Sequence, residues 1–418
     1  MGRYSYLGID PVFVFRNNGQ DPLKKIGKIL EKYPMAAPKN GMRFLGGAVG
    51  YLTYDLGIQL EKKLKFSPKP GLGVPDCAFG FYNTVVIIDH FKRSLNICAS
   101  GFPEKNYLTA KLLARENLKK MERIISQSTD EKDGSLKNQQ MVNPAVDLKS
   151  NFSKAEYLRA VKRAKAYIRA GDIYQVNLSQ RFQAKTNLSA CQIYQRLRQI
   201  NPACFCAYFD AGDFQILSSS PERFLSLEKG KVTTRPMKGT RARSANRKKD
   251  LLLKADLLKS AKDKAELVMI VDLERNDLGK VCSYDSIAVT NLRKLEKYNT
   301  VYQTTATIEG KLFPAKTAID LVRACFPGGS ITGCPKMRAM EIINELEPDR
   351  RSIYTGALGY LSFSGEMDFN ILIRTILKKD KRIYFGVGGG IVADSSCEEE
   401  YEETLVKAKA MFEAIHAH

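Results

Sequence analysis

Apolar and polar residues alternate along residues 173–182, which is the pattern of a strand with two unlike faces. Such a strand turns Tyr174, Val176 and Leu178 to one side and Gln175, Asn177 and Ser179 to the other. A helix is predicted before it, because Ser153 and Glu156 form an S-x-x-E capping box and apolar residues follow at helical spacing as far as Gly171. The amide-rich face makes this strand a candidate wall of a binding site.

The remaining chain mixes the periods of strands and helices. Residues 1–125 predict strands and turns that end in a helix, and they form the N-terminal part of the fold. Residues 126–149 are polar, which predicts an exposed linker. Residues 150–418 predict helices near 249–278, 316–325, 335–345 and 398–415, with strands between them, one over 369–376. Strands joined by hairpins, with helices between the blocks, predict an α+β protein with large antiparallel sheets.

The composition is that of a globular protein. The chain has 418 residues, of which 44% are hydrophobic and 27% are charged, so it can bury a large core. No run approaches the roughly 18 apolar residues of a membrane span, and the start lacks the pattern of a secretory signal. The nine cysteines are scattered without a CxxC pair, which is typical of reduced thiols. We therefore expect a cytoplasmic protein without a membrane partner.

The formal net charge of +21 raises the possibility of nucleic-acid binding. However, the basic residues are spread along the chain, and the densest stretch, residues 241–249, also fits a solvated loop and helix start. A basic surface equally suits a small anionic substrate. The three histidines, His90, His416 and His418, leave almost no room for a histidine-based triad or zinc site. Acid–base or metal chemistry therefore has to use carboxylates, lysine or tyrosine.

Two pairs of carboxylates have the spacing of one helix face. Asp263 and Glu266 are three residues apart on one predicted helix, and Glu400 and Glu403 are three apart on another. Such pairs are common on solvated helix faces, but two together can also supply hard oxygen ligands for Mg²⁺. Arg374 is a charged residue on an otherwise apolar strand, which predicts either a structural salt bridge or a clamp for a ligand carboxylate.

Seven ordered motifs resemble those of the chorismate-utilising enzymes. They are Gly171–Phe182, Ser220–Phe224, Arg235–Thr240, Glu266–Asp277, Gly328–Lys336, Gly390–Ser395 and Glu400–Thr404. The resemblance is dense over residues 150–415 and looser over 44–100. It implies a sandwich of two large antiparallel β-sheets with helices on the outside, as in anthranilate synthase component I.

The resemblance also implies roles for individual residues. Glu222 corresponds to the general acid that protonates the leaving hydroxyl of chorismate. Glu266 and Glu403 correspond to the ligands of an Mg²⁺ cofactor, with Asp263 and Glu400 in water-mediated positions around it. The positions that hold the two carboxylates of the substrate are Tyr354, Arg374, Gly388, Gly390 and Lys407. Thr332 lies in the loop that faces the ring.

Two positions separate the reactions within the family. Isochorismate and salicylate synthases carry a water-activating lysine where this chain has Gln175, so addition of water is not expected. Anthranilate synthases usually have alanine where this chain has Lys238, whereas aminodeoxychorismate synthases have a lysine that attacks C2 of the ring as a nucleophile. The resemblance therefore favours amination of chorismate to 4-amino-4-deoxychorismate, with anthranilate synthase component I as the alternative and a nucleic-acid-binding protein on a decayed enzyme fold as a remote one.

Three further features follow from the resemblance. Gln303 stands where anthranilate synthases have a histidine linked to pyruvate elimination, which agrees with the Lys238 interpretation. Cys334 replaces the usual alanine of its loop and is interpreted as a tolerated small residue. Nothing in the chain resembles a glutaminase, so we expect a separate glutamine amidotransferase subunit to deliver the ammonia, and no nucleic acid among the partners.

Overall fold

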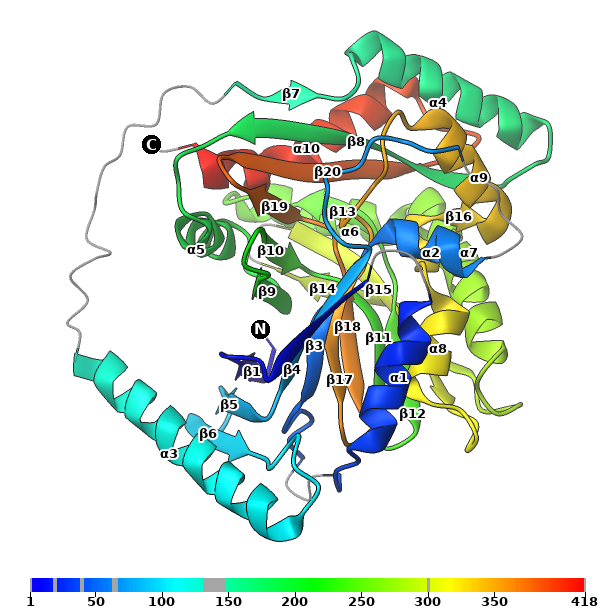
Figure 1. Ribbon diagram of the computed structural model, residues 1–418. Coiled ribbons are helices and arrows are strands. Elements are labelled where there is room, and N and C mark those ends of the chain that lie inside the picture. Colours follow the sequence, from blue (N-terminus) through cyan, green and yellow to red (C-terminus); the bar gives the residue numbers. More distant parts are fainter. Residues whose placement is uncertain are drawn as a thin grey trace.

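The computed structural model of the protein describes residues 2–17, 21–37, 41–61, 67–130, 147–298 and 301–416. Two large antiparallel sheets pack against each other, with helices around them (Figure 1). This arrangement confirms the predicted α+β sandwich. None of the helices in these ranges is both long and apolar enough to cross a membrane.

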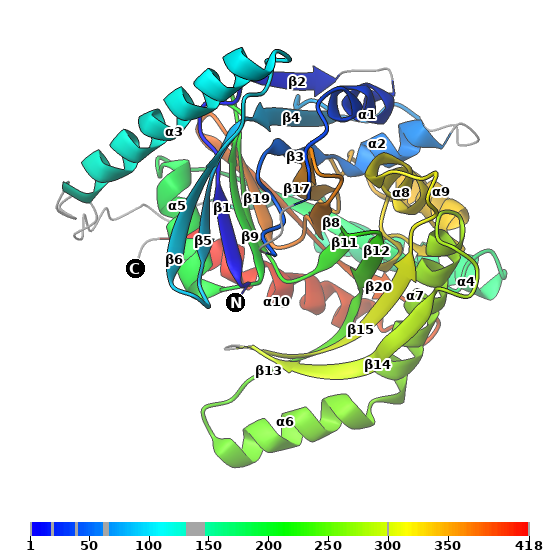
Figure 2. The same cartoon turned by 90° about the horizontal axis from the view of Figure 1, so that it is seen from below.

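The larger sheet has ten strands in the described part of the chain. In spatial order they are β13 (Met237–Ala242), β15 (Val301–Lys311), β12 (Lys231–Arg235), β11 (Arg223–Glu228), β18 (Met367–Ile371), β17 (Ala357–Ser362), β3 (Gly47–Leu52), β4 (Cys77–Tyr82) and β2 (Phe13–Asn17), and β14 (Ala288–Lys297) pairs with β15. The pairing of β3 with β17 joins part of the first 125 residues to a sheet whose other strands come from residues 223–371. Figure 2 shows β13, β14 and β15 curving outward, with α6 along them.

The smaller sheet of the sandwich has seven strands within the described ranges. They are β16 (Gly333–Cys334), β8 (Gln175–Lys185), β20 (Arg382–Ile391), β19 (Thr375–Lys379), β10 (Gln215–Ser220) and β9 (Phe205–Asp210), and β7 (Lys149–Ser150) pairs with β8. The long β8–β20 ladder brings Gly390 opposite Asn177. A third sheet is formed by β1 (Tyr4–Leu7), β5 (Thr84–Asp89) and β6 (Ser94–Ala99).

The core between the two large sheets is aromatic. The ring of Tyr51 on β3 meets Phe209 and Phe214 of the smaller sheet edge-on, at 5.8 and 5.9 Å between centroids. The helices pack outside the sheets. They are α1 (Pro22–Lys32), α2 (Tyr54–Leu60), α3 (Tyr107–Asp130), α4 (Lys154–Arg169), α5 (Ala190–Ile200), α6 (Arg247–Lys259), α7 (Ala261–Gly279), α8 (Ala318–Cys325), α9 (Lys336–Leu346) and α10 (Cys397–Ile415), with a 3₁₀ turn η1 (Gly329–Ile331).

Local signals predicted helix starts well. The capping box of Ser153 and Glu156 is present at the start of α4, as predicted. The single helix predicted over residues 249–278 is wrong, because Ser260 ends α6 and its side chain caps α7 by accepting a hydrogen bond from the Asp263 amide. Helix α3 continues to Asp130, into the predicted linker 126–149, of which residues 131–146 lie outside the described residues.

The single strand predicted over residues 369–376 is also wrong. Strand β18 ends at Ile371 in the larger sheet, and β19 begins at Thr375 in the smaller one. Arg374, between them, has a φ of +50°, a left-handed conformation that breaks a strand. Tyr174 was expected on the core face of its strand, but it precedes β8 and is 72% exposed, since the strand begins only at Gln175.

Candidate active site

Lys238 on β13 lies close to the amide-rich strand β8 and to the glycine run of β20. A methyl group at Gly390 would stand 2.0 Å from Nε2 of Gln175 and 3.4 Å from Nζ of Lys238. Only glycine leaves room for both side chains at this crossing. Gln175 Oε1 and Asn177 Oδ1 are buried acceptors without a hydrogen-bond donor in the described part of the chain. Buried acceptors of this kind suit a ligand that carries hydroxyl donors.

Glu222 lies in the short link between β10 and β11 and is almost fully buried. Burial raises the pKa of its carboxyl to about 7, and the nearby cations Lys238 and Lys407 limit the rise. Ser330 donates a hydrogen bond to Glu222 Oε1 over 2.6 Å, and the amide of Met237 donates another. A carboxyl with this pKa still carries a proton near neutral pH, which is what a general acid requires.

The two predicted carboxylate pairs meet across the site from α7 and α10. Burial raises the pKa of Glu266 and Glu400, whereas the ammonium group of Lys407 lowers the pKa of Glu403. The charge of Glu403 also raises the pKa of Glu266, and the ammonium group of Lys238 lowers the pKa of both carboxyls. The site therefore interleaves carboxylates with lysines.

Two of these carboxylates have further partners. Glu400 Oε1 accepts a hydrogen bond from Ser395 over 2.6 Å, and Lys262 lies 4.0 Å away. Asp263 forms an ion pair with Arg241 at 3.1 Å, so its charge is already neutralised by the protein. Its side chain also approaches the backbone of Gly239, next to Lys238. Asp263 is thus placed beside the site, bound to an arginine.

The carboxylate oxygens at this site are chemically suitable ligands for the Mg²⁺ cofactor that the resemblance implies. No group of three or more His, Cys, Asp or Glu side chains in the described ranges is close enough to hold a metal by itself. Mg²⁺ commonly takes one or two carboxylates and completes its shell with water and substrate oxygens, so two glutamates suffice. Glu266 and Glu403 are the residues that would hold it. Oxygens of Glu400 and Glu403 approach the same point over Gly389, at 2.9 and 3.4 Å.

Arg374 has no carboxylate partner among the described residues. Burial lowers the pKa of its guanidinium, and a side-chain hydrogen bond runs from its Nη1 to Asn201 Oδ1 over 2.8 Å. Of the two roles predicted for Arg374, the structural salt bridge is absent from the described part of the chain. A partly buried guanidinium without a carboxylate partner is suited to an anionic ligand, because a charge taken from water needs a counter-charge.

The remaining predicted residues have different neighbours. Lys407 Nζ donates to the Gly388 carbonyl over 2.8 Å and forms an ion pair with Glu403 at 2.6 Å. Thr332 is fully buried, and its hydroxyl donates into its own loop, to the Gly328 carbonyl at 2.9 Å. Cys334 is partly buried, and burial raises the pKa of its thiol, which fits a small filler residue better than a nucleophile.

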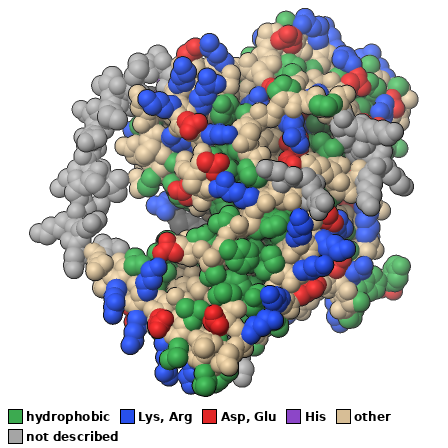
Figure 3. Space-filling view, viewed as in Figure 1, with side chains coloured by type: hydrophobic (Ala, Val, Ile, Leu, Met, Phe, Trp, Pro, Cys, Tyr) green, Lys and Arg blue, Asp and Glu red, His purple; other side chains and the backbone are tan. Residues whose placement is uncertain are grey.

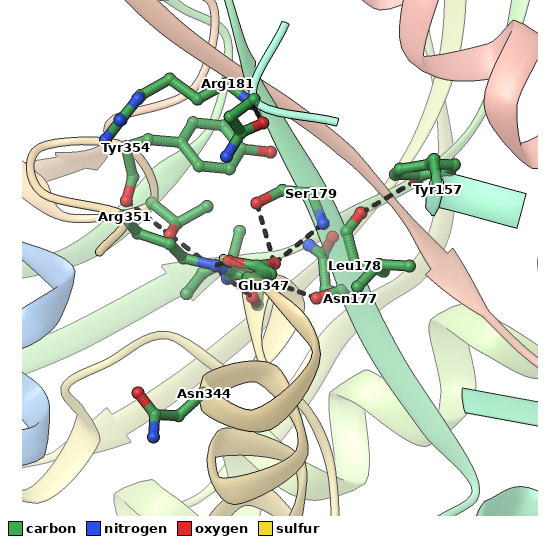
Figure 4. A network of polar contacts seen from close by, with 12 residues as sticks. Tyr157, Asn177, Leu178, Ser179, Arg181, Asn344, Glu347, Arg351 and Tyr354 are labelled. Carbon is green, nitrogen blue, oxygen red and sulfur yellow. Dashed lines mark hydrogen bonds and ion pairs between the residues drawn. The ribbon is translucent and has the colours of Figure 1, made fainter. Parts of the chain in front are cut away.

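Tyr354 lies near a buried ion pair between Arg351 and Glu347, which the sequence analysis did not predict. Its ring packs over Gly386, where a methyl group would be 2.3 Å from the ring. Nearby, Arg351 Nη2 and Nε donate to the two oxygens of Glu347 over 2.6 and 2.9 Å (Figure 4). Glu347 also accepts bonds from the amide and hydroxyl of Ser179 on β8, both at 2.9 Å. The pair therefore joins the end of α9 to the wall of the site.

Arg351 further ties together two segments that line the site. It donates to the carbonyl of Ile331 in η1 over 2.9 Å and to that of Asn177 on β8 over 2.6 Å. Its guanidinium lies 4.7 Å from the ring centroid of Tyr54, a residue of the N-terminal part. In the sequence, Glu347 and Arg351 are four residues apart and resemble an ordinary pair on a helix surface. Only the burial of the turn after α9 could have indicated that Arg351 connects segments of the site.

The structure thus brings most of the predicted site together. Eight of the predicted residues interact with one another directly or through shared neighbours. They are Glu222, Lys238, Glu266, Gly388, Gly390, Glu400, Glu403 and Lys407. Arg374 and Tyr354 occupy separate surroundings built around Asn201 and Arg351. Basic side chains elsewhere are scattered among acidic ones on the face in Figure 3. In the densest basic stretch, Arg241 and Arg243 are paired with aspartates.

The fold and site define an enzyme that holds a small organic anion between cations and carboxylates. A family model described as chorismate binding enzyme matches residues 2–413, so the chain belongs to that family and is a chorismate-utilising enzyme. It is 40% identical to anthranilate synthase component 1 of Acetivibrio thermocellus, over 99% of this chain and 87% of that one. It is 39% identical to aminodeoxychorismate synthase component 1 of Salmonella typhimurium, over 99% and 90%.

A solved structure gives the same result for the fold. The crystal structure of anthranilate synthase component I from Streptococcus pneumoniae superposes with a TM-score of 0.86 at 32% identity, covering 98% of this chain and 92% of that one. The relatives carry both names at similar identity, so similarity alone leaves the particular reaction open.

Proposed function

We propose that the protein is component I of an aminodeoxychorismate synthase and converts chorismate and ammonia to 4-amino-4-deoxychorismate. The observation that carries this proposal is the place of Lys238, whose amine lies beside Gly390 and among Glu222, Glu266 and Glu403. A lysine on a solvated strand would not influence the buried carboxyl of Glu222 together with the partly exposed carboxyls of Glu266 and Glu403. Gln303 supports the same proposal, because it is buried beside Thr240 and offers an amide where pyruvate elimination would need a histidine.

In the proposed reaction, the amine of Lys238 forms a C–N bond at C2 of the ring while the C4–O bond breaks. Glu222 gives its proton to the departing hydroxyl, which leaves as water. Ammonia then forms a C–N bond at C4, and the bond to Lys238 breaks as the ring double bonds return to their first arrangement. Arg374 and Lys407 neutralise the carboxylates of the substrate.

Bound Mg²⁺ would supply a positive charge for a ring carboxylate as negative charge develops nearby. Glu266 and Glu403 would hold it, with Asp263 and Glu400 around it. Removal of divalent cations with a chelator is expected to abolish turnover, and added Mg²⁺ is expected to restore it. Full activity of the chelated protein would contradict the metal assignment.

The ammonia is proposed to come from a separate glutamine amidotransferase subunit. In the described residues, the imidazole of His90 bonds the hydroxyl of Ser5 and that of His416 lies against the Phe412 carbonyl, rather than a cysteine thiol. Purified chain is therefore expected to use ammonium but not glutamine. Turnover with glutamine alone would refute the partner proposal.

A second candidate is anthranilate synthase component I. It is favoured by the relative from Acetivibrio thermocellus and by the superposition on the Streptococcus pneumoniae structure. Both reactions use the same substrate and differ in the ring carbon that receives the nitrogen and in the release of pyruvate.

Product analysis separates the two candidates. Purified chain is incubated with chorismate, Mg²⁺ and ammonium, beside Lys238→Ala and a control, Lys231→Ala, which removes an exposed lysine paired with Glu309 on the adjoining strand. The proposal expects 4-amino-4-deoxychorismate without pyruvate, its loss in Lys238→Ala, and no change in Lys231→Ala. Fluorescent anthranilate with an equal amount of pyruvate would replace the proposal with the second candidate.

A further inference from the structure

Glu274 on α7 is a buried acid that the proposed reaction does not use. It follows Glu266 by eight residues and faces inward with Ile270 and Leu278. Its carboxyl meets Thr234 of β12, and its side chain packs beneath η1, 3.4 Å from the point where a methyl group would stand on Gly329. Gly329 belongs to the turn whose Ser330 donates to Glu222, and Thr234 belongs to the strand that leads into Met237.

The hydrogen bonds of Thr234 indicate which group carries the proton. Its hydroxyl lies 2.6 Å from the Phe224 carbonyl, which can only accept, and 2.9 Å from Glu274 Oε2. A threonine hydroxyl has one hydrogen. If that hydrogen goes to the shorter contact, the hydrogen in the contact with Glu274 has to come from the glutamate. With the threonine hydrogen on the Phe224 carbonyl, the geometry favours a neutral Glu274 carboxyl as the donor.

The charges around Glu274 agree with a neutral carboxyl. Burial raises its pKa to about 8, and the neighbouring carboxyls of Glu222 and Asp277 add to the rise. Lys336 of α9 offers little compensation, because its ammonium already bonds Asp277 and the carbonyls of Cys325 and Pro327. The thiol of Cys325 at the end of α8 stays protonated, since burial raises its pKa as well.

Glu274 is connected to Glu222 by two routes. Through η1, it supports Gly329, and the next residue, Ser330, donates to Glu222 over 2.6 Å. Through β12, it bonds Thr234, three residues before Met237, whose amide donates to Glu222. Ser330 therefore stands on a segment that Glu274 contacts, and Met237 opens β13, two residues after the end of the strand that Glu274 contacts.

We propose that Glu274, as a neutral acid, is a positioning residue for Glu222, holding η1 and β12 so that Ser330 and the Met237 amide point at that carboxyl. The inference rests on the role of Glu222 in the proposed function. An ionised Glu274 would lose its hydrogen bond to Thr234 and place a second negative charge behind Glu222 in a site that must accept an anion. Activity therefore falls when Glu274 loses its proton.

The first test measures thermal stability against pH for the wild type and Glu274→Gln, which keeps the shape and a hydrogen-bond donor but does not titrate. The folded protein retains the Glu274 proton up to about pH 8, whereas the unfolded chain loses it above about pH 4.5. The wild type must therefore lose stability relative to Glu274→Gln as the pH rises through this window. A Tm difference that stays constant from pH 5 to pH 8 would overturn the neutral state.

The second test compares pH profiles of kcat/KM for chorismate. Two ionisations, of Glu222 and Glu274, steepen the alkaline limb of the wild type, whereas one remains in Glu274→Gln. At pH 9, one unit above the pKa of Glu274, about a tenth of the wild-type molecules keep this proton. At that pH, kcat/KM of Glu274→Gln should therefore exceed kcat/KM of the wild type by about tenfold. An alkaline limb in Glu274→Gln as steep as that of the wild type would refute the positioning role.

The controls separate this inference from the proposed function. Glu366→Gln removes another buried acid with a raised pKa, near Glu228 and Arg43. It is expected to alter stability with pH but to leave the pH profile of kcat/KM unchanged. If Glu222→Gln kept wild-type activity, the proton donor of the proposed function would be wrong, while the stability window would still report the state of Glu274. If Glu274→Gln unfolded while Glu274→Asp stayed folded, the site would need a carboxyl that an amide cannot replace, and the proposed role of a neutral donor would be overturned.

Discussion

Replacing Arg351 by methionine should destabilise the protein strongly, because the substitution leaves Glu347 buried without its cation. Arg351 and Glu347 are both almost fully buried and are joined by two hydrogen bonds, at 2.6 and 2.9 Å. Removing one partner of such a pair costs about 3–5 kcal/mol. The carbonyls of Ile331 and Asn177 also lose their donor, which places the cost toward the upper end of that range.

The corresponding shift in melting temperature follows from the size of the chain. With an unfolding entropy of about 2.1 cal/mol/K per residue, 418 residues give about 0.9 kcal/mol/K, so the expected loss is about 3–6 °C. The assay is a thermal melt of Arg351→Met beside Arg338→Met, which removes a half-exposed arginine on α9 paired with Asp172 and Glu341. The control should change by about 1 °C or less, because exposed pairs contribute little.

A double variant tests the reasoning itself. Arg351→Met combined with Glu347→Met removes both charges, so it should recover part of the stability that the single variant loses. The KM for chorismate should rise in Arg351→Met, because Asn177 and η1 lose their common anchor. An Arg351→Met protein that melts within 1 °C of the wild type would show that this ion pair contributes nothing net, and the stated cost would be refuted.

Three further outcomes are expected. Gly390→Ala should lower kcat/KM by about 10²-fold, since its methyl group would displace Gln175 and crowd Lys238. The control Gly279→Ala, with open space around it, should leave kcat/KM unchanged. Equal activity of the two variants would contradict the close approach of Gln175 and Lys238 to Gly390. Wild-type kcat/KM should fall as the pH rises through about 7, because Glu222 must be protonated to act. The apparent pKa of this alkaline limb should move in Glu222→Asp, and a limb that keeps the wild-type pKa in the variant would point to another acid. Arg374→Gln should raise the KM for chorismate by about 10- to 150-fold, the value of a charge-assisted hydrogen bond, while kcat changes less; an unchanged KM would exclude a carboxylate clamp.

The sequence predicted those features that depend on neighbours in the chain. The capping box of Ser153 and the two carboxylate pairs all have local patterns. Glu274 had a signal that was overlooked, because it falls on the inward stripe of α7 with Ile270 and Leu278. A charged residue on such a stripe is a candidate for a shifted pKa.

Other features depended on partners far away in the sequence. The break at Arg374 sends β18 and β19 into different sheets, and its left-handed backbone is imposed by the packing of both sheets. Periodicity alone reads the segment as one strand. The bond between Arg351 and the carbonyl of Asn177 joins positions 174 residues apart, and no local pattern could have indicated it.

The pairing of β3 with β17 limits how this chain can be divided. A fragment that began after the predicted linker would keep every residue named in the proposed reaction, yet it would lack the strand that covers the edge of β17. It would also lose Tyr54, which lies against the guanidinium of Arg351. An uncovered edge of a sheet invites pairing with other chains. Cutting the polypeptide within residues 131–146 while retaining both pieces, by contrast, would preserve that pairing, so a nicked protein can stay assembled where a truncated one aggregates.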